Sequence, residues 1–127
     1  MDTSEIEFKA KNSEGEWVHG CYAEYKVFGD EVRRVIIDRK GKSETIDPDT
    51  LCEYTRLRDF YGKKIFVNDR AEMYVVNTTY YRRPTEDKLT GTICRETNGE
   101  FYFSVSDTGE KYTINSTIVV SNSEFDV

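Results

Sequence analysis

Residues 89–106 read LTGTICRETNGEFYFSVS, and this stretch indicates two β-strands joined by a tight turn. The turn centres on Asn98-Gly99, a pair typical of a two-residue type I′ hairpin, because both residues tolerate positive φ angles. The segment before the turn is rich in β-branched residues. The segment after it alternates apolar and polar residues, and its apolar side chains are expected to point inward: Phe101, Phe103 and Val105.

The pattern continues on both sides of this hairpin. Asp107-Thr108-Gly109 indicates a further turn, after which residues 111–114 and 117–121 are expected to be short strands. Upstream, residues 71–81 form a long β-rich run, and residues 82–87 are expected to be a polar exposed loop. The last half of the chain, residues 63–127, therefore predicts a small SH3-like barrel lobe.

The first half, residues 1–62, predicts a second β lobe, built as a meander. Asp47-Pro48 indicates one short helical turn, with Asp47 as the N-cap and proline at the first helical position. The remaining signals alternate between strand and turn. Strands are expected over 6–11, 17–27, 32–39 and 65–67, with a short one from Cys52, and turns over 12–16, 28–31, 40–42 and 59–63.

Composition supports the same fold class. Val, Ile, Thr and the aromatic residues number 49 of 127, against three Ala, three Leu and no Gln. The first group fits a pleated sheet, whereas Ala, Leu and Gln favour helices. We therefore expect an all-β protein, a single domain over 1–127 made of an antiparallel meander sheet and a small barrel, with few short helical turns.

The net charge of −6 is unevenly distributed. Residues 1–32 carry eight acids and three bases, residues 33–95 ten acids and fourteen bases, and residues 96–127 six acids and one base. The basic centre is either an anion-binding patch or a segment neutralised by the acidic ends across the sheets. The protein as a whole is acidic and repels polyanions, so the second interpretation is favoured.

Several classes of protein are not supported. No apolar run approaches the length that spans a bilayer, and the first thirty residues lack a secretory signal pattern. The cysteines, Cys21, Cys52 and Cys94, are odd in number and widely spaced, unlike a disulfide framework or a zinc site. We therefore expect a cytoplasmic protein of a bacterial host, with no membrane contact and mostly packed thiols.

Two stretches carry a family resemblance. The opening, Glu7 to Ala10 followed by Gly15 to Tyr22, pairs a basic-aromatic strand with a Trp-containing strand. The centre, Asp47 to Asp59, continues through Gly62-Lys63-Lys64-Ile65-Phe66 to Asn68-Asp69. Both resemble YopX-type proteins of phages and prophages, as do the tail segments Gly91-Thr92-Ile93, Gly99 to Tyr102 and Ile118 to Asn122.

The resemblance implies an all-β phage protein, and it carries over no activity and no catalytic residue. Glu53 stands where the family usually has Gln. Arg56 and Asn68 stand where it usually has Gly. If the family's turn geometry is kept, these two residues adopt positive φ at a cost in free energy, smaller for Asn than for Arg.

Catalytic and metal sites have weak support. His19 and Cys21 share one face of a strand and could form a nucleophile pair, but residues at i and i+2 rarely aim at one substrate atom. Asp47 and Asp49 could bind a hard cation together with Glu53 or Asp69, although capping explains their spacing better. No phosphate-binding loop or nucleophile elbow is present. We therefore expect a protein without enzymatic activity that binds no metal and no cofactor.

Two sets of residues are candidates for binding a partner. The acidic ends offer carboxylates that could lie where phosphates lie on a nucleic-acid-binding protein: Glu5, Glu7, Glu14, Glu16, Glu110, Glu124 and Asp126. The centre offers aromatic and basic residues that could anchor a protein or stack bases: Tyr74, Tyr80, Tyr81, Arg82, Arg83, Arg56, Arg58, Lys63 and Lys64.

The leading expectation is a non-enzymatic phage accessory protein that binds another protein, in its most specific form an inhibitor of a host defence nuclease system. The alternative is a small-barrel module that binds nucleic acid or nucleotide through the basic centre. Exposed sheet edges leave homo-oligomerisation open.

Overall fold

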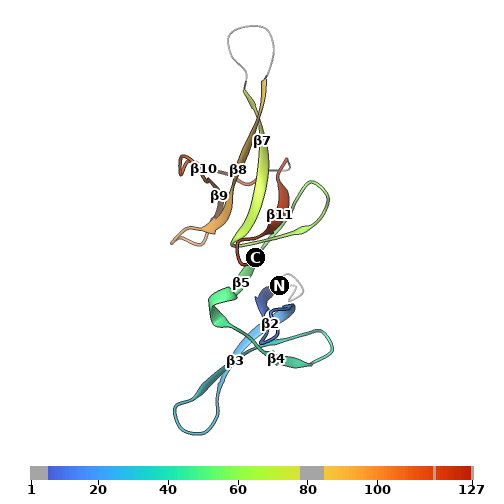
Figure 1. The fold of residues 1–127 in the computed structure, drawn as a ribbon, viewed down its shortest axis with the longest axis vertical. Helices are drawn as coiled ribbons and strands as arrows, with labels where there is room; N and C mark the ends of the chain where they lie inside the picture. The colour runs from blue at the N-terminus through green and yellow to red at the C-terminus, as the bar shows by residue number, and fades with distance from the viewer. Residues whose placement is uncertain (1–5, 78–84, 116, 127) are drawn as a thin grey trace. The chain divides into compact units, whose positions relative to one another are not determined.

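The computed structural model describes residues 6–77, 85–115 and 117–126 (Figure 1). These residues form β-strands, turns and one short 3-10 helix, η2 (Pro48–Thr50), so the all-β prediction is confirmed. The Asp47 carboxylate caps η2 by accepting a hydrogen bond from the Asp49 N–H at 3.0 Å, as the sequence predicted. The chain divides into two compact units, residues 1–56 and 57–127, whereas the expected lobe boundary was 62/63.

The first sheet has the strand order β4-β3-β2-β1-β5-β6. Its strands are β1 (Phe8–Lys11), β2 (Trp17–Lys26), β3 (Val32–Ile37), β4 (Ser43–Thr45), β5 (Cys52–Arg58) and β6 (Lys64–Phe66), and β5 crosses the division between the units. A small core lies within the first unit, with Ala10, Ile36 and Ile46 buried against Phe8, Val18, Tyr22 and Leu51.

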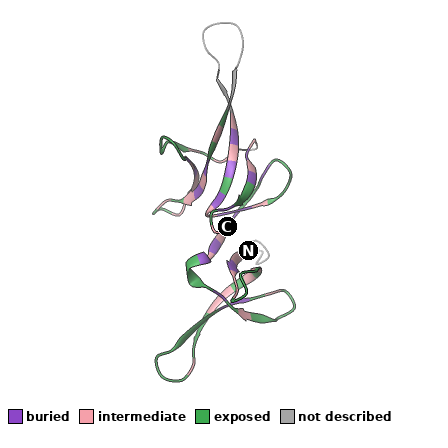
Figure 2. Cartoon of the chain, in the orientation of Figure 1, coloured by how far each residue is buried: buried purple, intermediate pink, exposed green. Residues whose placement is uncertain are grey.

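The second sheet has the order β10-β9-β8-β7-β11 and is antiparallel throughout. Its strands are β7 (Asp69–Asn77), β8 (Thr85–Arg95), β9 (Phe101–Val105), β10 (Lys111–Tyr112) and β11 (Val119–Ser123). Buried residues alternate with partly exposed ones at the start of β7 (Figure 2). The core consists of Ile65, Ala71, Met73, Ile93, Phe103, Val105, Ile118 and Val120, which confirms the inward prediction for Phe103 and Val105.

Two expectations about this unit are corrected. The strands that the structure describes form an open sheet rather than a closed barrel, and the SH3-like detail is not confirmed. The predicted loop over 82–87 is wrong for Thr85 to Asp87, which pair with Asn77 to Val75 as the first part of β8. A partner strand can hold polar residues in a ladder that their own propensity disfavours. Residues 82–84 lie outside the described residues.

Four hairpin turns share one geometry. In each, the residue at the first position accepts a hydrogen bond from the N–H of a glycine three residues later and donates its own N–H to the carbonyl of the residue after that glycine. The four turns are 12–16, 38–42, 59–63 and 96–100, with positive φ at Gly15, Gly41, Gly62 and Gly99. This is a type I turn closed by a glycine bulge.

In three of these turns the first residue is Asn or Asp, and its side chain strengthens the turn. One side-chain oxygen of Asn12, Asp38 or Asp59 accepts hydrogen bonds from two backbone N–H groups of its own turn, at 2.8–3.0 Å. The fourth turn corrects the type I′ prediction for Asn98-Gly99. A type I′ turn needs positive φ at both residues, and among the described non-glycine residues only Arg56 and Asn68 have it.

Arg56 and Asn68 have φ angles of 69° and 74°. These are the two positions at which the resemblance to YopX-type proteins leads one to expect glycine, and both have positive φ angles. The cost in free energy is larger for arginine, because its Cβ lies close to a backbone carbonyl oxygen in the left-handed region. Asn tolerates this region better, because its short polar side chain can form local hydrogen bonds.

Candidate functional site

A groove of about 450 Å³ lies on the second unit between the 59–63 turn and the outer faces of β7 and β11. Three aromatic side chains and one carboxylate line it, and we call it the aromatic groove: Phe60, Tyr61, Glu72, Tyr74, Thr117 and Val119. Phe60 and Tyr61 are 67% and 77% exposed, and their rings meet edge to face at 5.1 Å between centroids. The groove therefore presents ready-made apolar surface with one acidic group.

Hydrogen bonds hold the wall of the groove against β11. The Phe60 N–H donates to the Ile118 carbonyl at 2.9 Å. The Val120 N–H donates to Asp59 Oδ2 at 3.1 Å, while Asp59 Oδ1 serves the turn itself. Asp59 is buried, so one carboxylate both closes the turn and ties it to the sheet. The two aromatic side chains are thus carried on a fixed backbone.

The floor of the groove comes from β7. Ala71 and Met73 enter the core, so Glu72 and Tyr74 face outward with the period of a strand. Thr117 Oγ1 donates a hydrogen bond to the Tyr74 carbonyl at 2.8 Å and holds the chain before β11 beside β7. Lys88, on β8, lies 3.5 Å from the Glu72 carboxylate, and both groups remain open to solvent.

The basic candidates gather near this turn. Arg58 donates from Nη1 to the Gly62 carbonyl at 2.8 Å, across the hairpin that carries Phe60 and Tyr61. Lys63 is exposed at the end of the turn and Lys64 is half-buried on β6, while Arg56 is exposed on β5. Of the aromatic and basic candidates, Tyr80, Tyr81, Arg82 and Arg83 lie outside the described residues, and Tyr74 lines the aromatic groove.

The acidic candidates are distributed over both units. Glu7, Glu14 and Glu16 belong to the first unit, and Glu110, Glu124 and Asp126 to the second. Several have local roles. The Tyr112 hydroxyl donates to Glu110 at 2.9 Å, and Asp126 accepts the Ser123 N–H at 2.9 Å. Glu5 lies outside the described part of the chain.

Carboxylates lie close to one another at the 12–16 turn. The protonated Glu16 carboxyl can donate a hydrogen bond to Glu14, and this bond, followed by the negative charge of Glu14, raises the pKa of Glu16; the charge of Glu44 on β4 raises it further. Like charges disfavour ionisation of their neighbours, which is the physical cause. The turn thus concentrates negative charge on an exposed surface, and Glu44 is a member that sequence reasoning missed. We call Glu14, Glu16 and Glu44 the acidic turn.

His19 and Cys21 both lie on β2, as the sequence predicted, and both are exposed. They line a second groove, of about 410 Å³, with Glu7 and the end of β3. His19 Nδ1 lies 3.4 Å from Glu7 Oε2, so the imidazole interacts with a carboxylate. Cys52 is buried and Cys94 half-buried, so the expected packing of thiols holds for these two and not for Cys21.

The metal alternative finds no geometric support where the chain is described. Asp47 caps η2, and the buried Asp69 accepts the Phe66 N–H at 2.9 Å. Within the described ranges, no three His, Cys, Asp or Glu side chains are grouped as ligands. The carboxylates of Asp47 and Asp69 therefore accept hydrogen bonds from backbone N–H groups.

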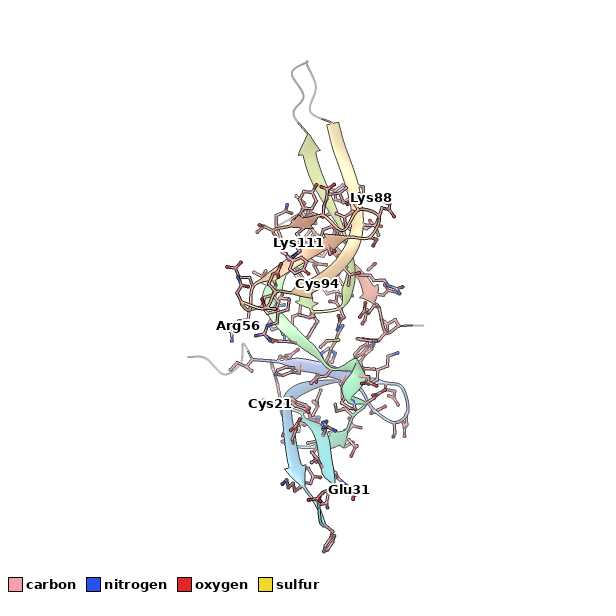
Figure 3. All side chains as sticks on the ribbon, turned by 90° about the vertical axis from the view of Figure 1, so that its left-hand side faces the viewer. Cys21, Glu31, Arg56, Lys88, Cys94 and Lys111 are labelled. Atoms are coloured by element: carbon pink, nitrogen blue, oxygen red, sulfur yellow. The ribbon has the colours of Figure 1, made fainter. Side chains whose placement is uncertain are left out.

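The outer face of β8, β9 and β10 carries a second polar cluster, in which Cys94 and Lys111 lie on the same side of the sheet (Figure 3). Burial raises the pKa of the Cys94 thiol, which keeps it protonated and unreactive. Lys111 stacks on the Tyr102 ring at 4.9 Å and bonds to Glu96, whose carboxylate raises the pKa of the amine.

Phe60, Tyr61 and Glu72 were not among the candidates drawn from the sequence, although Tyr74 was. The signal lay in the turn itself, where two aromatic residues occupy positions between Asp59 and Gly62 that the other turns give to polar side chains. Their meeting with Tyr74 depends on the contact between the turn and β11.

No protein-family model matches the chain, and no curated protein sequence matches it. The residues that the structure describes include no helix with the length and hydropathy needed to cross a bilayer.

Proposed function

We propose that this chain is a non-enzymatic binding protein that recognises a basic surface of another protein. The observation that carries the proposal is the aromatic groove, in which Phe60 and Tyr61 stand exposed on a hydrogen-bonded turn beside Tyr74. Large aromatic side chains dominate the energetics of protein interfaces. A rigid turn presents them with little loss of conformational entropy on binding.

The charge of the protein indicates the sign of the partner. The chain carries −6, and the acidic turn concentrates carboxylates strongly enough to raise the pKa of Glu16. Such a surface attracts a basic partner and accelerates its association. The resemblance to YopX-type phage proteins supports a specific version, in which the partner is a host defence nuclease whose nucleic-acid channel is positively charged.

A tagged copy expressed in infected bacteria tests this function. We expect it to retain a nucleic-acid-binding protein, identified by mass spectrometry, and the retention to weaken as salt is raised. The double variant Glu14→Lys, Glu16→Lys should lose most of the retention. Glu31→Lys changes the charge of an exposed residue at another turn of the same unit and is the matched control (Figure 3). Recovery of the same proteins by the wild type and the double variant would exclude the acidic turn as the surface.

Nucleic-acid binding is the second candidate, favoured by the position of Arg58 and Lys63 on the hairpin that exposes Phe60 and Tyr61. Aromatic faces can stack bases while basic groups follow the phosphates. Fluorescence polarisation with single- and double-stranded DNA and RNA at low salt tests it. Since even non-specific binders usually reach about 10⁻⁴ to 10⁻⁶ M, no binding at tens of micromolar protein would rule it out.

A further inference from the structure

The turn that carries Phe60 and Tyr61 can be compared with three other turns of the same chain. Four turns share one hydrogen-bonding pattern, and their two central positions hold Ser13-Glu14, Arg39-Lys40, Phe60-Tyr61 and Thr97-Asn98. Three pairs are polar, as exposed turn positions usually are. The geometry therefore does not require aromatic residues at 60 and 61, and their exposure needs another explanation.

The aromatic groove is suited to a cation. Aromatic faces attract a positive charge, and Glu72 places a carboxylate among Phe60, Tyr61 and Tyr74. The carboxylate disfavours a phosphate group, and an apolar occupant would desolvate it without offering a partner. Lys88 already approaches Glu72 at 3.5 Å, and this exposed pair is easily exchanged for another cation.

Two other outward-facing aromatic rings, those of Trp17 and Tyr102, are already covered by lysines of the same chain. Lys9 and Lys11 lie 4.7 and 5.4 Å from the centre of the Trp17 ring, and Lys111 covers Tyr102. Among the residues that the structure describes, no lysine or arginine stacks on Phe60, Tyr61 or Tyr74. As far as the described residues are concerned, these rings carry no cation of the chain itself.

We propose that the aromatic groove binds an arginine side chain of a protein partner, an inference that rests on the proposed function of binding a basic protein surface. The planar guanidinium stacks on aromatic rings and can donate two parallel hydrogen bonds to one carboxylate. An arginine would displace Lys88 from Glu72 and lie against Tyr61 and Tyr74. Lys88 is thus an internal competitor for the site.

The test is NMR titration of the isotope-labelled full chain with a capped pentapeptide, Gly-Ser-Arg-Ser-Gly. Its twin carries citrulline, which has nearly the shape of arginine and no charge. We expect the arginine peptide to shift the ring signals of Tyr61 and Tyr74 and the amide signal of Thr117, with a dissociation constant on the order of 1 mM, as suits a single side chain. The citrulline peptide should bind about tenfold more weakly.

Variants give effects of opposite sign. Glu72→Gln and Tyr61→Ala should each weaken binding of the arginine peptide several-fold, whereas Lys88→Ala should strengthen it by freeing Glu72. Tyr61 and Lys88 are exposed, so these changes leave the core intact. Phe28→Ala removes an aromatic side chain that is 94% exposed on the first unit, and it should leave binding unchanged.

Equal affinity for the arginine and citrulline peptides, or weaker binding by Lys88→Ala, would overturn the inference. So would shifts of Tyr61 and Tyr74 produced by an eight-residue oligothymidine and not by the arginine peptide, since the groove would then take a base. The proposed function can fail separately: peptide binding with no basic protein retained from cells would leave the groove assigned and the function wrong. If the wild type and Glu72→Gln retained a basic partner equally, the proposed function would stand and the assignment of the aromatic groove to an arginine would be wrong.

Discussion

Asp59 offers the sharpest test of how the aromatic groove is held in place. Its carboxylate accepts three backbone hydrogen bonds, from the N–H groups of Tyr61 and Lys63 in its own turn and of Val120 on β11. Asp38 has the same position in the corresponding turn of the first unit, and among the described residues it accepts the two bonds within the turn and none from another strand. A comparison of substitutions at Asp59 and Asp38 therefore separates the stability that the turn contributes from the stability that the link to β11 contributes.

The magnitudes follow from the exposure of each donor. In both turns the N–H groups released by removal of the carboxylate can turn to water, so Asp38→Ala should cost about 1 kcal/mol. Asp59→Ala also leaves the N–H of the buried Val120 without an acceptor, which adds about 1–3 kcal/mol. Asp59→Asn keeps an oxygen for the turn, as Asn12 does, and turns an amide N–H₂ toward Val120, so its cost is that of the link alone.

Urea unfolding followed by amide NMR signals measures these costs, with Ile93 and Phe103 reporting the second unit and Ile36 the first. Separate reporters are needed because a chain of two units need not unfold in one step. Faster hydrogen exchange at Val120 in both Asp59 variants is the local sign. If Asp59→Ala and Asp38→Ala cost the same within about 0.5 kcal/mol, or if Asp59→Asn costs nothing, the link to β11 is not a stabilising contact.

Three further predictions test other features. Gly91→Ala should destabilise the second unit by several kcal/mol, on the order of a severe overpacking mutation, because the new Cβ would lie 2.0 Å from the Ser104 carbonyl oxygen; thermal unfolding near the wild-type temperature would contradict the close strand contact. Arg56→Gly should be more stable than Arg56→Ala by about 1 kcal/mol, since only glycine relieves the positive φ; equal urea midpoints would mean that no strain is present. Glu14→Gln should leave the melting temperature unchanged near pH 3 and raise it near pH 7, because a raised folded-state pKa of Glu16 means that the wild type loses stability as pH rises through that pKa; a constant difference across pH would refute the repulsion.

Hairpin turns were the most predictable part of the fold. Asn12, Asp38 and Asp59 each precede a glycine by three residues, and short-range hydrogen bonds within five residues decide the rest. The error at Asn98-Gly99 has the same origin. The dipeptide alone favours type I′, while the pairing of Glu96 with Glu100 sets a longer loop in which only the glycine needs positive φ.

The extent of the strands was less predictable, because pairing is a property of two segments. Thr85 to Asp87 have the composition of a loop and nevertheless continue β8 opposite Asn77 to Val75. β4 is three residues long and polar, and it forms because the 38–42 turn brings it beside β3. Local propensity spans only about 1 kcal/mol per residue in sheets, so a neighbouring strand can override it.

The sequence by itself determined the all-β class, the positions of the turns, the cap of η2 and the acidic character of the chain. Each depends on composition or on contacts between residues close in the chain. Tertiary structure decided which side chains meet. Tyr74 was a candidate from sequence, but its grouping with Phe60, Tyr61 and Glu72 needs the bond between Asp59 and Val120, which are 61 residues apart. Glu44 likewise joins Glu14 and Glu16 only in the folded chain. A binding surface is made of long-range neighbours, and those are selected by the packing of the sheets and not by local propensity.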